Sequence, residues 1–220
     1  MKRILILTEG QTEETFVRDI LMPHLEPFGI CAIPILAKTK RTKEGITFKG
    51  GITNYFKVKN DIISLLQDSN SVCVTTMLDF YGIPTNFPGM ATIPKSDCLS
   101  KVAHLEAAFA EDIKNPKFIP YLQLHEFEGL LFSSTKSIQS AFPTASKIKD
   151  LDAIKAQFQT PEHINDSLET APHKRLSGIF PGYDKVFHGA IIAKHAGLAS
   201  FRSECSRFDH WVTVLENLAK

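Results

Sequence analysis

Carboxylates follow three separate apolar segments of the chain, each near the point where the segment ends. Glu9 comes just after the first segment, Asp79 closes a second, and Glu126 and Glu128 follow a third. Clustered carboxylates repel one another unless a cation lies among them, and oxygen ligands of this kind suit Mg²⁺ or Mn²⁺. The pattern therefore predicts a divalent-cation site whose ligands come from remote parts of the chain: Glu9, Asp79, Glu126 and Glu128.

Each acid also has a structural interpretation. Glu9 would interact favourably with the N-terminal end of the helix that follows it, and so would Glu13 and Glu14 in the first turn of that helix. Asp79 would cap its own loop, and at least one of the two acids near residue 127 would face solvent. Their common position after apolar segments is what favours a functional site.

A parallel sheet would bring these acids together. Residues 4–7, 31–38 and 71–79 predict buried strands, and residues 117–132 contain another. Apolar residues recur at helical spacing between them, at 16–25, 52–67 and 97–112. This alternation predicts an α/β fold with a mostly parallel sheet flanked by helices. In such sheets ligands bind outside the carboxyl ends of the strands, which is where the acids lie. Pro34 predicts that its strand lies at an edge of the sheet or forms a bulge.

The last third of the chain is predicted to be mainly helical, with short helices broken by TPEH, TAPHKRL and FPGYDK. We expect an α/β core over residues 1–133 and a helical C-terminal part over residues 134–220 that packs on it. No linker composition marks the boundary, so one single domain is the alternative. A long Pro- and Gly-rich loop follows Asp79, and loops of that length are commonly functional or mobile.

Basic residues gather in two places where a phosphate backbone could bind. A loop carries Lys38, Lys40 and Arg41, and the C-terminal part carries Lys174, Arg175 and Lys185. Such groups bind phosphates with an affinity that falls as salt rises. The alternatives are a solvated loop in the first case and ordinary surface charges in the second.

The overall composition disfavours several classes of protein. The chain has 220 residues, of which 43% are hydrophobic and 22% charged, and its formal net charge of +1 makes no global argument for nucleic acid or membrane. No apolar run approaches the roughly 20 residues that span a bilayer, and the first run is too short for a signal peptide. Four isolated cysteines without a CxxC pair favour a reduced, cytoplasmic compartment. The motifs of P-loop ATPases, dinucleotide-binding proteins and serine hydrolases are absent.

Several separated motifs carry a resemblance to a known superfamily. LTEGQTEETF, followed by a strand that ends in MLDFYG, resembles the Toprim superfamily. These are compact α/β metal-binding domains of topoisomerases, primases and overcoming-lysogenization-defect-type nucleases. The segments EGQTEE, LDFYGIP and LHEFEGLLF, with APHKRLSGIFPGYDKVFHG, IAKHAGL and RFDHW, resemble an uncharacterised bacterial family of the Toprim clan. This resemblance covers nearly the whole chain. It implies a Toprim-like, Rossmann-like fold and association with AAA- or ABC-type ATPases in phage-defence or restriction loci.

The resemblance also implies Mg²⁺-dependent chemistry on a phosphodiester. Glu9 matches the glutamate of the first strand, which acts in the superfamily as a general acid or base or as a metal ligand. Asp79 matches the first acid of an Asp-x-Asp motif, but Tyr81 replaces the second, so a ligand is missing unless Glu126 or Glu128 supplies it. We therefore expect Glu9, Asp79 and Glu128 to be catalytic, with Glu9 or Glu128 accepting a proton from water.

These observations support three hypotheses. The first is a cytoplasmic, Mg²⁺- or Mn²⁺-dependent nuclease or nuclease subunit that cleaves DNA or RNA in a defence-type system with an ATPase partner. The second is a non-catalytic partner of an ATPase that binds nucleic acid or a nucleotide, which Tyr81 favours. The third is a small-molecule phosphohydrolase whose long loop after Asp79 covers a nucleotide.

Overall fold

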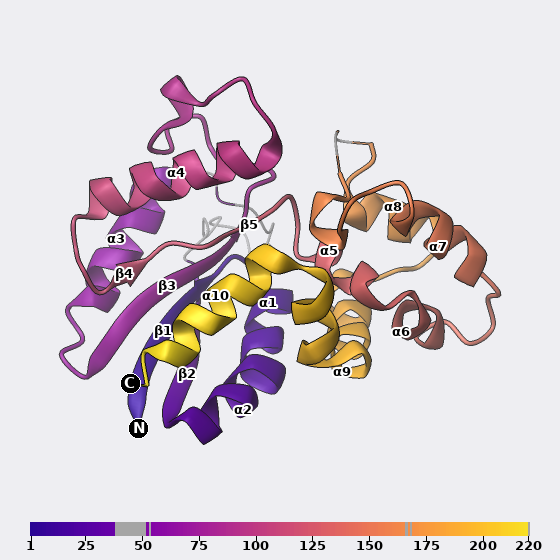
Figure 1. Cartoon of the computed structure of the whole chain (residues 1–220), viewed down its shortest axis with the longest axis horizontal. Coiled ribbons are helices and arrows are strands. Elements are labelled where there is room, and N and C mark those ends of the chain that lie inside the picture. The colour runs from indigo at the N-terminus through magenta and orange to yellow at the C-terminus, as the bar shows by residue number, and fades with distance from the viewer. Residues whose placement is uncertain (38–51, 53, 166, 168, 220) are drawn as a thin grey trace, which may run out of the picture.

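A parallel sheet forms the centre of the molecule (Figure 1). The computed structural model describes residues 1–37, 52, 54–165, 167 and 169–219. Within these residues five strands pair in the order β2-β1-β3-β4, with β5 also paired to β3, and every pair is parallel. The strands are β1 Lys2–Thr8, β2 Ile30–Leu36, β3 Ser71–Asp79, β4 Phe118–Ile119 and β5 Leu122–Gln123. The expected α/β fold with a mostly parallel sheet is therefore confirmed.

Helices cover both faces of the sheet because successive side chains of its central strand point to opposite faces. Ile4 and Ile6 of β1 are buried in one core, and Leu5 and Leu7 in the other. Figure 1 shows α3 and α4 on one side of the sheet and α1, α2 and α10 on the other. Burial on both faces explains why the strands are continuous apolar runs. The helices of this α/β part are α1 Gln11–Phe16, α2 Met22–Leu25, α3 Tyr55–Leu66 and α4 Cys98–Ile113, with a π-helical turn at Val17–Leu21 and 3-10 turns at Glu26–Phe28 and Met90–Thr92.

Two prolines limit the pairing of the strands. β2 is an edge strand, as Pro34 predicted. The strand expected within residues 117–132 is divided into β4 and β5, because Pro120 between them has no N–H to donate. Thr76 of β3 bridges the interruption: its hydroxyl accepts the Tyr121 N–H at 2.9 Å and donates to the Tyr121 carbonyl at 2.8 Å.

The rest of the chain is helical, as expected, and it packs on the sheet. Its helices are α5 Glu128–Leu131, α6 Thr135–Ser140, α7 Ile148–Lys155, α8 Pro172–Ile179, α9 Lys185–Glu204 and α10 Ser206–Asn217, with 3-10 turns at Phe132–Ser134 and Pro161–His163. The ring of Phe16 in α1 contacts those of Phe127, Phe201 and Phe208, with centroids 5.3 to 5.8 Å apart. Aromatic residues from both ends of the chain therefore share one core. None of the helices in the described ranges is both long and apolar enough to cross a membrane.

Candidate acidic site at the carboxyl edge of the sheet

Glu9 and Asp79 lie together at the carboxyl ends of β1 and β3. The two strands are neighbours, with Thr8 opposite Met77, so the residues that follow them emerge side by side. The Asp79 N–H donates to Oε2 of Glu9 at 3.0 Å. The predicted convergence of these two acids, 70 positions apart, is confirmed.

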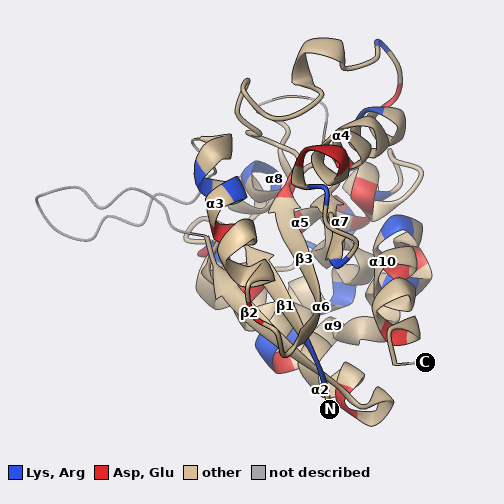
Figure 2. Cartoon of the chain, turned by 90° about the vertical axis from the view of Figure 1, so that its left-hand side faces the viewer, with Lys and Arg blue, Asp and Glu red and all other residues tan. Residues whose placement is uncertain are grey.

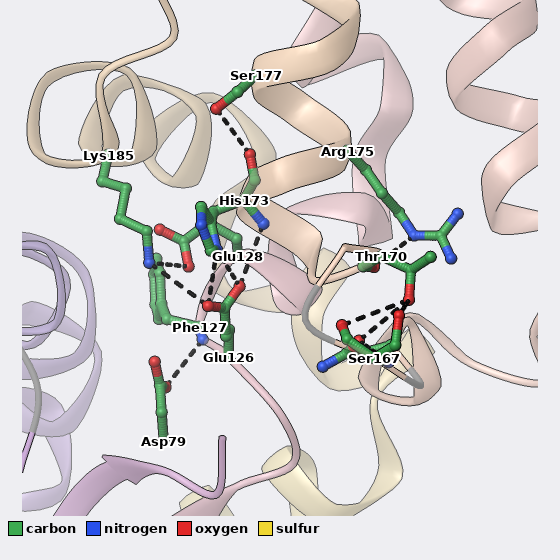
Figure 3. Close-up of polar contacts among 11 residues, drawn as sticks. Asp79, Glu126, Phe127, Glu128, Ser167, Thr170, His173, Arg175, Ser177 and Lys185 are labelled. Atoms are coloured by element: carbon green, nitrogen blue, oxygen red, sulfur yellow. Dashed lines mark hydrogen bonds and ion pairs between the residues drawn. The ribbon is translucent and has the colours of Figure 1, made fainter. Parts of the chain in front are cut away.

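The third acidic segment is attached to the same point through Asp79. Oδ1 of Asp79 accepts the backbone N–H of Phe127 at 3.0 Å, which fixes the turn that holds Glu126 and Glu128 (Figure 3). Asp79 therefore bonds another segment rather than capping its own loop. His125 has a φ of 68° in this turn, so the chain reverses there and α5 begins at Glu128.

Glu126 and Glu128 both point inward. Their side chains are 4% and 1% exposed, so the expectation that at least one faces solvent is wrong. The physical reason is that each has a basic partner from the C-terminal helices. His173 Nδ1 lies 2.7 Å from Oε1 of Glu126, and Lys185 Nζ donates to Oε2 of Glu128 at 3.1 Å (Figure 3).

Glu13 joins this group, although the sequence indicated only an interaction with the helix terminus. Oε2 of Glu13 accepts the Gly10 N–H at 2.9 Å, so the expected contact at the start of α1 is present. The side chain is nevertheless 7% exposed and borders the same cavity as Glu9 and Asp79. The signal available in the sequence was its position four residues after Glu9, at the first turn of the helix.

Four of these acids, Glu9, Glu13, Asp79 and Glu126, border a cavity of about 540 Å³. The turn after β1, the end of β2 and the loop after β3 form one part of its wall. Glu126, His173 of α8, and Lys185 and Val186 of α9 form another. Tyr81 also borders it. A volume of this size accommodates a nucleotide-sized ligand.

Burial and mutual repulsion raise the pKa values of three of the acids. Burial, followed by the charge of Glu13, raises the pKa of Glu9 to about 8. Burial, followed by the charge of Glu128, raises the pKa of Glu13 to about 7. Burial and the charge of Glu9 hold the pKa of Asp79 well above its usual value. The charge of Lys185 lowers the pKa of all three carboxyls, but it does not offset burial and the neighbouring acids.

The other two acids are better compensated. Burial raises the pKa of Glu126, but the hydrogen bond with His173 and the charge of Lys185 outweigh it, and the net direction is downward. For Glu128 burial prevails, and its pKa is raised despite Lys185. Burial disfavours the charged form of Lys185, but the acids around it, Glu128 first, keep its pKa above the usual value.

Comparison with known proteins gives a family without an assigned activity. Residues 8–216 match the model described as a domain of unknown function, DUF4276. The chain belongs to the DUF4276 family. No curated protein matches this DUF4276 chain.

Two solved structures are similar to the DUF4276 chain at low identity. One is the C-terminal region of the Burkholderia pseudomallei OLD protein, with 14% identity, complete coverage of both chains and a TM-score of 0.45. The other is the C-terminal region of the Xanthomonas campestris pv. campestris OLD protein, with 16% identity, coverage of 98% of this chain and 96% of that one, and a TM-score of 0.38.

The basic residues of the DUF4276 chain divide into three groups. Lys38, Lys40 and Arg41 lie outside the described residues. Lys174 and Arg175 do not border the cavity, and Nε of Arg175 donates to the Thr170 carbonyl at 2.7 Å, away from the acids (Figure 3). Of the three that the structure describes, only Lys185 lies at the acidic site. Figure 2 shows acidic and basic positions interspersed along the described helices.

The donor chemistry of the DUF4276 site fits a divalent cation in part. Glu9, Glu13 and Asp79 offer carboxylate oxygens, which are the donors that Mg²⁺ and Mn²⁺ prefer. Glu126 and Glu128 are already engaged by His173 and Lys185, so we assign neither of them to a cation. As the side chains stand, no group of three or more His, Cys, Asp or Glu in the described ranges is arranged to hold a metal ion.

Proposed function

We propose that this chain is a Toprim-like, divalent-cation-dependent nuclease, or the nuclease subunit of a larger assembly, that cleaves a phosphodiester. One observation carries the proposal. Glu9 and Asp79, from strands separated by a long stretch of chain, lie in contact at the sheet edge beside Glu13, and all three have raised pKa values. A cluster of buried carboxyls that is short of positive charge is suited to a cation that would bring a phosphate with it.

Glu9, Asp79 and Glu13 would hold Mg²⁺ or Mn²⁺ in this proposal. When bound, such an ion supplies a water of lowered pKa and neutralises charge on a phosphate oxygen. The residues of the chain have their own tasks. Lys185 presents an ammonium at the cavity, where it attracts a phosphate, and Glu128 holds Lys185 in place. Glu9 borders the cavity and would take up the proton that the attacking water releases.

The setting of this activity is also part of the proposal. The sequence resemblance implies DNA or RNA as substrate and an AAA- or ABC-type ATPase as partner, in a cytoplasmic defence-type system. The cavity is large enough for a nucleotide. Its volume fits one nucleotide of a nucleic-acid strand as well as a free nucleotide.

A second candidate function is a non-catalytic partner of an ATPase that binds nucleic acid or a nucleotide. Two observations favour it. Tyr81 borders the cavity where the motif has an acid, and Lys185 already compensates part of the negative charge. In this case Lys185 and the cavity bind phosphate, and no bond is broken.

A cleavage assay separates the two functions. Wild type is incubated with single- and double-stranded DNA and RNA, with Mg²⁺ or Mn²⁺, beside Glu9→Gln and Asp79→Asn. The control is Glu14→Gln, because Glu14 lies on α1 close to Glu9 in the sequence but does not border the cavity. We expect metal-dependent cleavage that falls by about 100-fold or more in the first two variants, the scale of a lost acid–base group, and is unchanged in the third.

Two other outcomes have defined meanings. Binding of nucleic acid without cleavage, unaffected by Glu9→Gln, supports the non-catalytic partner and contradicts the nuclease. If the chain alone neither binds nor cleaves, the assay is repeated with the proposed AAA- or ABC-type ATPase partner, and inactivity there also contradicts the nuclease.

A further inference from the structure

One histidine at the cavity has no task in the mechanism proposed above. His173 is the second residue of α8, and its side chain borders the cavity and is 25% exposed. It is 47 positions from Glu126 in the sequence, yet Figure 3 shows the two side chains in contact. Through this contact, α8 of the C-terminal part places a side chain that can carry a proton at the cavity.

Three hydrogen-bond contacts with Glu126 fix the orientation of this histidine. Nδ1 of His173 lies 2.7 Å from Oε1 and 2.8 Å from Oε2 of Glu126, and the backbone N–H of His173 donates to Oε2 at 3.2 Å. A carboxylate held this close keeps the proton of the ring on Nδ1. Nε2 is on the opposite side of the ring, and within the described residues it has no hydrogen-bond partner.

A purely structural role explains only part of this arrangement. The bond from the backbone N–H of His173 to Glu126 anchors the start of α8, and any residue with a backbone N–H could make it. It does not account for an imidazole whose one nitrogen is held by a buried carboxylate while the ring borders an acidic cavity. That combination is the usual means of orienting a histidine for proton transfer.

We propose that His173, oriented by Glu126, donates a proton to the leaving oxygen of the phosphodiester. The inference rests on the nuclease function proposed above. In the step, the oxygen of water forms a bond to phosphorus while the bond from phosphorus to the leaving ester oxygen breaks. The proton on Nε2 of His173 moves to the leaving oxygen, and the proton lost by water goes to Glu9. Both groups then exchange protons with solvent through the cavity, so atoms and charge balance.

The position of His173 favours the leaving oxygen over the attacking water. Attacking and leaving oxygens lie roughly in line on opposite sides of phosphorus. The uncompensated carboxyls Glu9, Glu13 and Asp79 belong to the sheet edge and the turn after β1, whereas His173 belongs to the wall formed by α8 and α9. The charged groups near the histidine are Glu126, which contacts its Nδ1, and Lys185, whose Nζ lies 3.8 Å from Oε1 of Glu126.

The test compares two substrates that differ in how much their leaving group needs a proton. The leaving group of a thymidine dinucleotide is a strongly basic alkoxide, which needs a proton. The leaving group of thymidine 5′-(4-nitrophenyl) phosphate is 4-nitrophenolate, which is stable without one. We expect His173→Asn to lower kcat by about 100-fold on the dinucleotide, the scale of general acid catalysis, and to leave the nitrophenyl ester nearly unchanged. Asparagine keeps an N–H for Glu126 but cannot donate a proton from the position of Nε2.

Two further variants sharpen this comparison. Glu126→Gln should show the same preference with a smaller loss, because it disturbs only the orientation of the ring. His195→Asn is the matched control: this histidine also belongs to the C-terminal helices, with Nδ1 3.1 Å from Oγ of Ser140, and does not border the cavity. It should leave both substrates unaffected.

Each other result overturns the inference in a recognisable way. Equal losses on both substrates, or no loss on either, with wild type active, exclude proton donation by His173 and leave the nuclease function standing. A wild type that cleaves neither substrate, with and without the ATPase, refutes the nuclease function itself, and the inference falls with it. Thermal unfolding of each variant identifies a folding defect, in which case His173→Gln takes the place of His173→Asn.

Discussion

At the scale of single residues, the site is defined by three carboxyls, Glu9, Glu13 and Asp79, whose hydrogen-bond donors are backbone N–H groups rather than basic side chains. Burial is the largest cause of the raised pKa values of Glu9, Glu13 and Asp79, and the charge of a neighbouring acid comes second for each. Among the residues that the structure describes, only Lys185 places a permanent positive charge beside them. The sheet edge therefore carries a group of side chains that favours protons or a cation, as the proposed function requires.

The first prediction concerns Glu9 and pH. Its pKa of about 8 lies above the 4.5 of an ordinary glutamate, so between these values the folded chain holds a proton that the unfolded chain has released. The stability due to this proton is complete below pH 4.5 and is lost as the pH rises through 8. Because glutamine has no proton to lose, Glu9→Gln should gain stability relative to wild type as the pH rises across this window, and the gain should be largest at its upper end.

Thermal unfolding without divalent cations from pH 5 to 9 measures this effect. Glu14→Gln serves as the control, and its curve should run parallel to that of wild type. A Glu9→Gln variant that is less stable than wild type by the same amount at every pH would show that the carboxyl of Glu9 is already compensated in the folded chain.

The sequence predicted some members of this site and missed others for a physical reason. Glu9 and Asp79 could be found because the ends of parallel strands meet at one edge, whatever their separation in sequence. The partners of Glu126 and Glu128 could not, since His173 and Lys185 follow them by 47 and 57 positions and depend on how helices pack. Their roles in binding and catalysis stay predictions.

At the scale of elements, α9 connects the site with the rest of the C-terminal part. Asp184 accepts the Phe187 N–H at 2.7 Å and so fixes the first turn of α9, where Lys185 lies. At Gly189 the helix passes close to α1, since a Cβ there would be 3.0 Å from Cγ2 of Thr12. Further on, Gly197 has a φ of 74° and a ψ of 156° and bends the helix before it meets α10.

The second prediction tests this bend. The backbone conformation of Gly197 is nearly restricted to glycine, and no atom lies within 4 Å of where a Cβ would be. Gly197→Ala should therefore lower the free energy of unfolding by about 1–3 kcal/mol through backbone strain alone. Gly178→Ala in α8 is the matched control, because it too has open space but ordinary helical geometry, and it should stabilise the chain by roughly 0.5–1 kcal/mol.

Urea unfolding of both variants measures the difference. Equal effects of the two substitutions would show that the chain can straighten α9 at no cost, and would remove Gly197 as a determinant of the fold.

The elements themselves were largely accessible from the sequence. Continuous apolar runs predicted the three longer strands, β1, β2 and β3. Pro34 predicted that β2 lies at an edge of the sheet or forms a bulge, and it lies at an edge. The division between β4 and β5 was missed because the apolar pattern of residues 117–132 continues through Pro120, whereas the hydrogen-bond ladder does not. The bend in α9 was missed because a single glycine within a helical pattern does not reveal a positive φ.

At the scale of the whole molecule, the α/β part and the helical part share one core. Trp211 of α10 is 3% exposed, its indole N–H donates to the Thr75 hydroxyl of β3 at 3.0 Å, and its ring stacks on Tyr121 with centroids 4.4 Å apart. The last helix of the chain is therefore packed on the central sheet. The sequence suggested a boundary near residue 133. In the structure, the segments before and after this residue bury each other's apolar surface.

The third prediction follows from this shared core: residues 1–133 and 134–220 unfold together. Trp211 is the only tryptophan, so its fluorescence reports the contact between α10 and the sheet, while far-UV circular dichroism reports all helices and strands. The two signals should give one midpoint in urea.

The variant Thr75→Val tests the same point. It leaves the buried indole N–H of Trp211 without its hydrogen-bond partner, which should lower the free energy of unfolding by about 1–3 kcal/mol. If the chain unfolds as one cooperative unit, both midpoints must fall by the same amount. If instead the fluorescence midpoint falls while the main dichroism transition stays in place, the C-terminal helices detach on their own. His173 and Lys185 would then leave the acidic site with them, because α8 and α9 carry both residues.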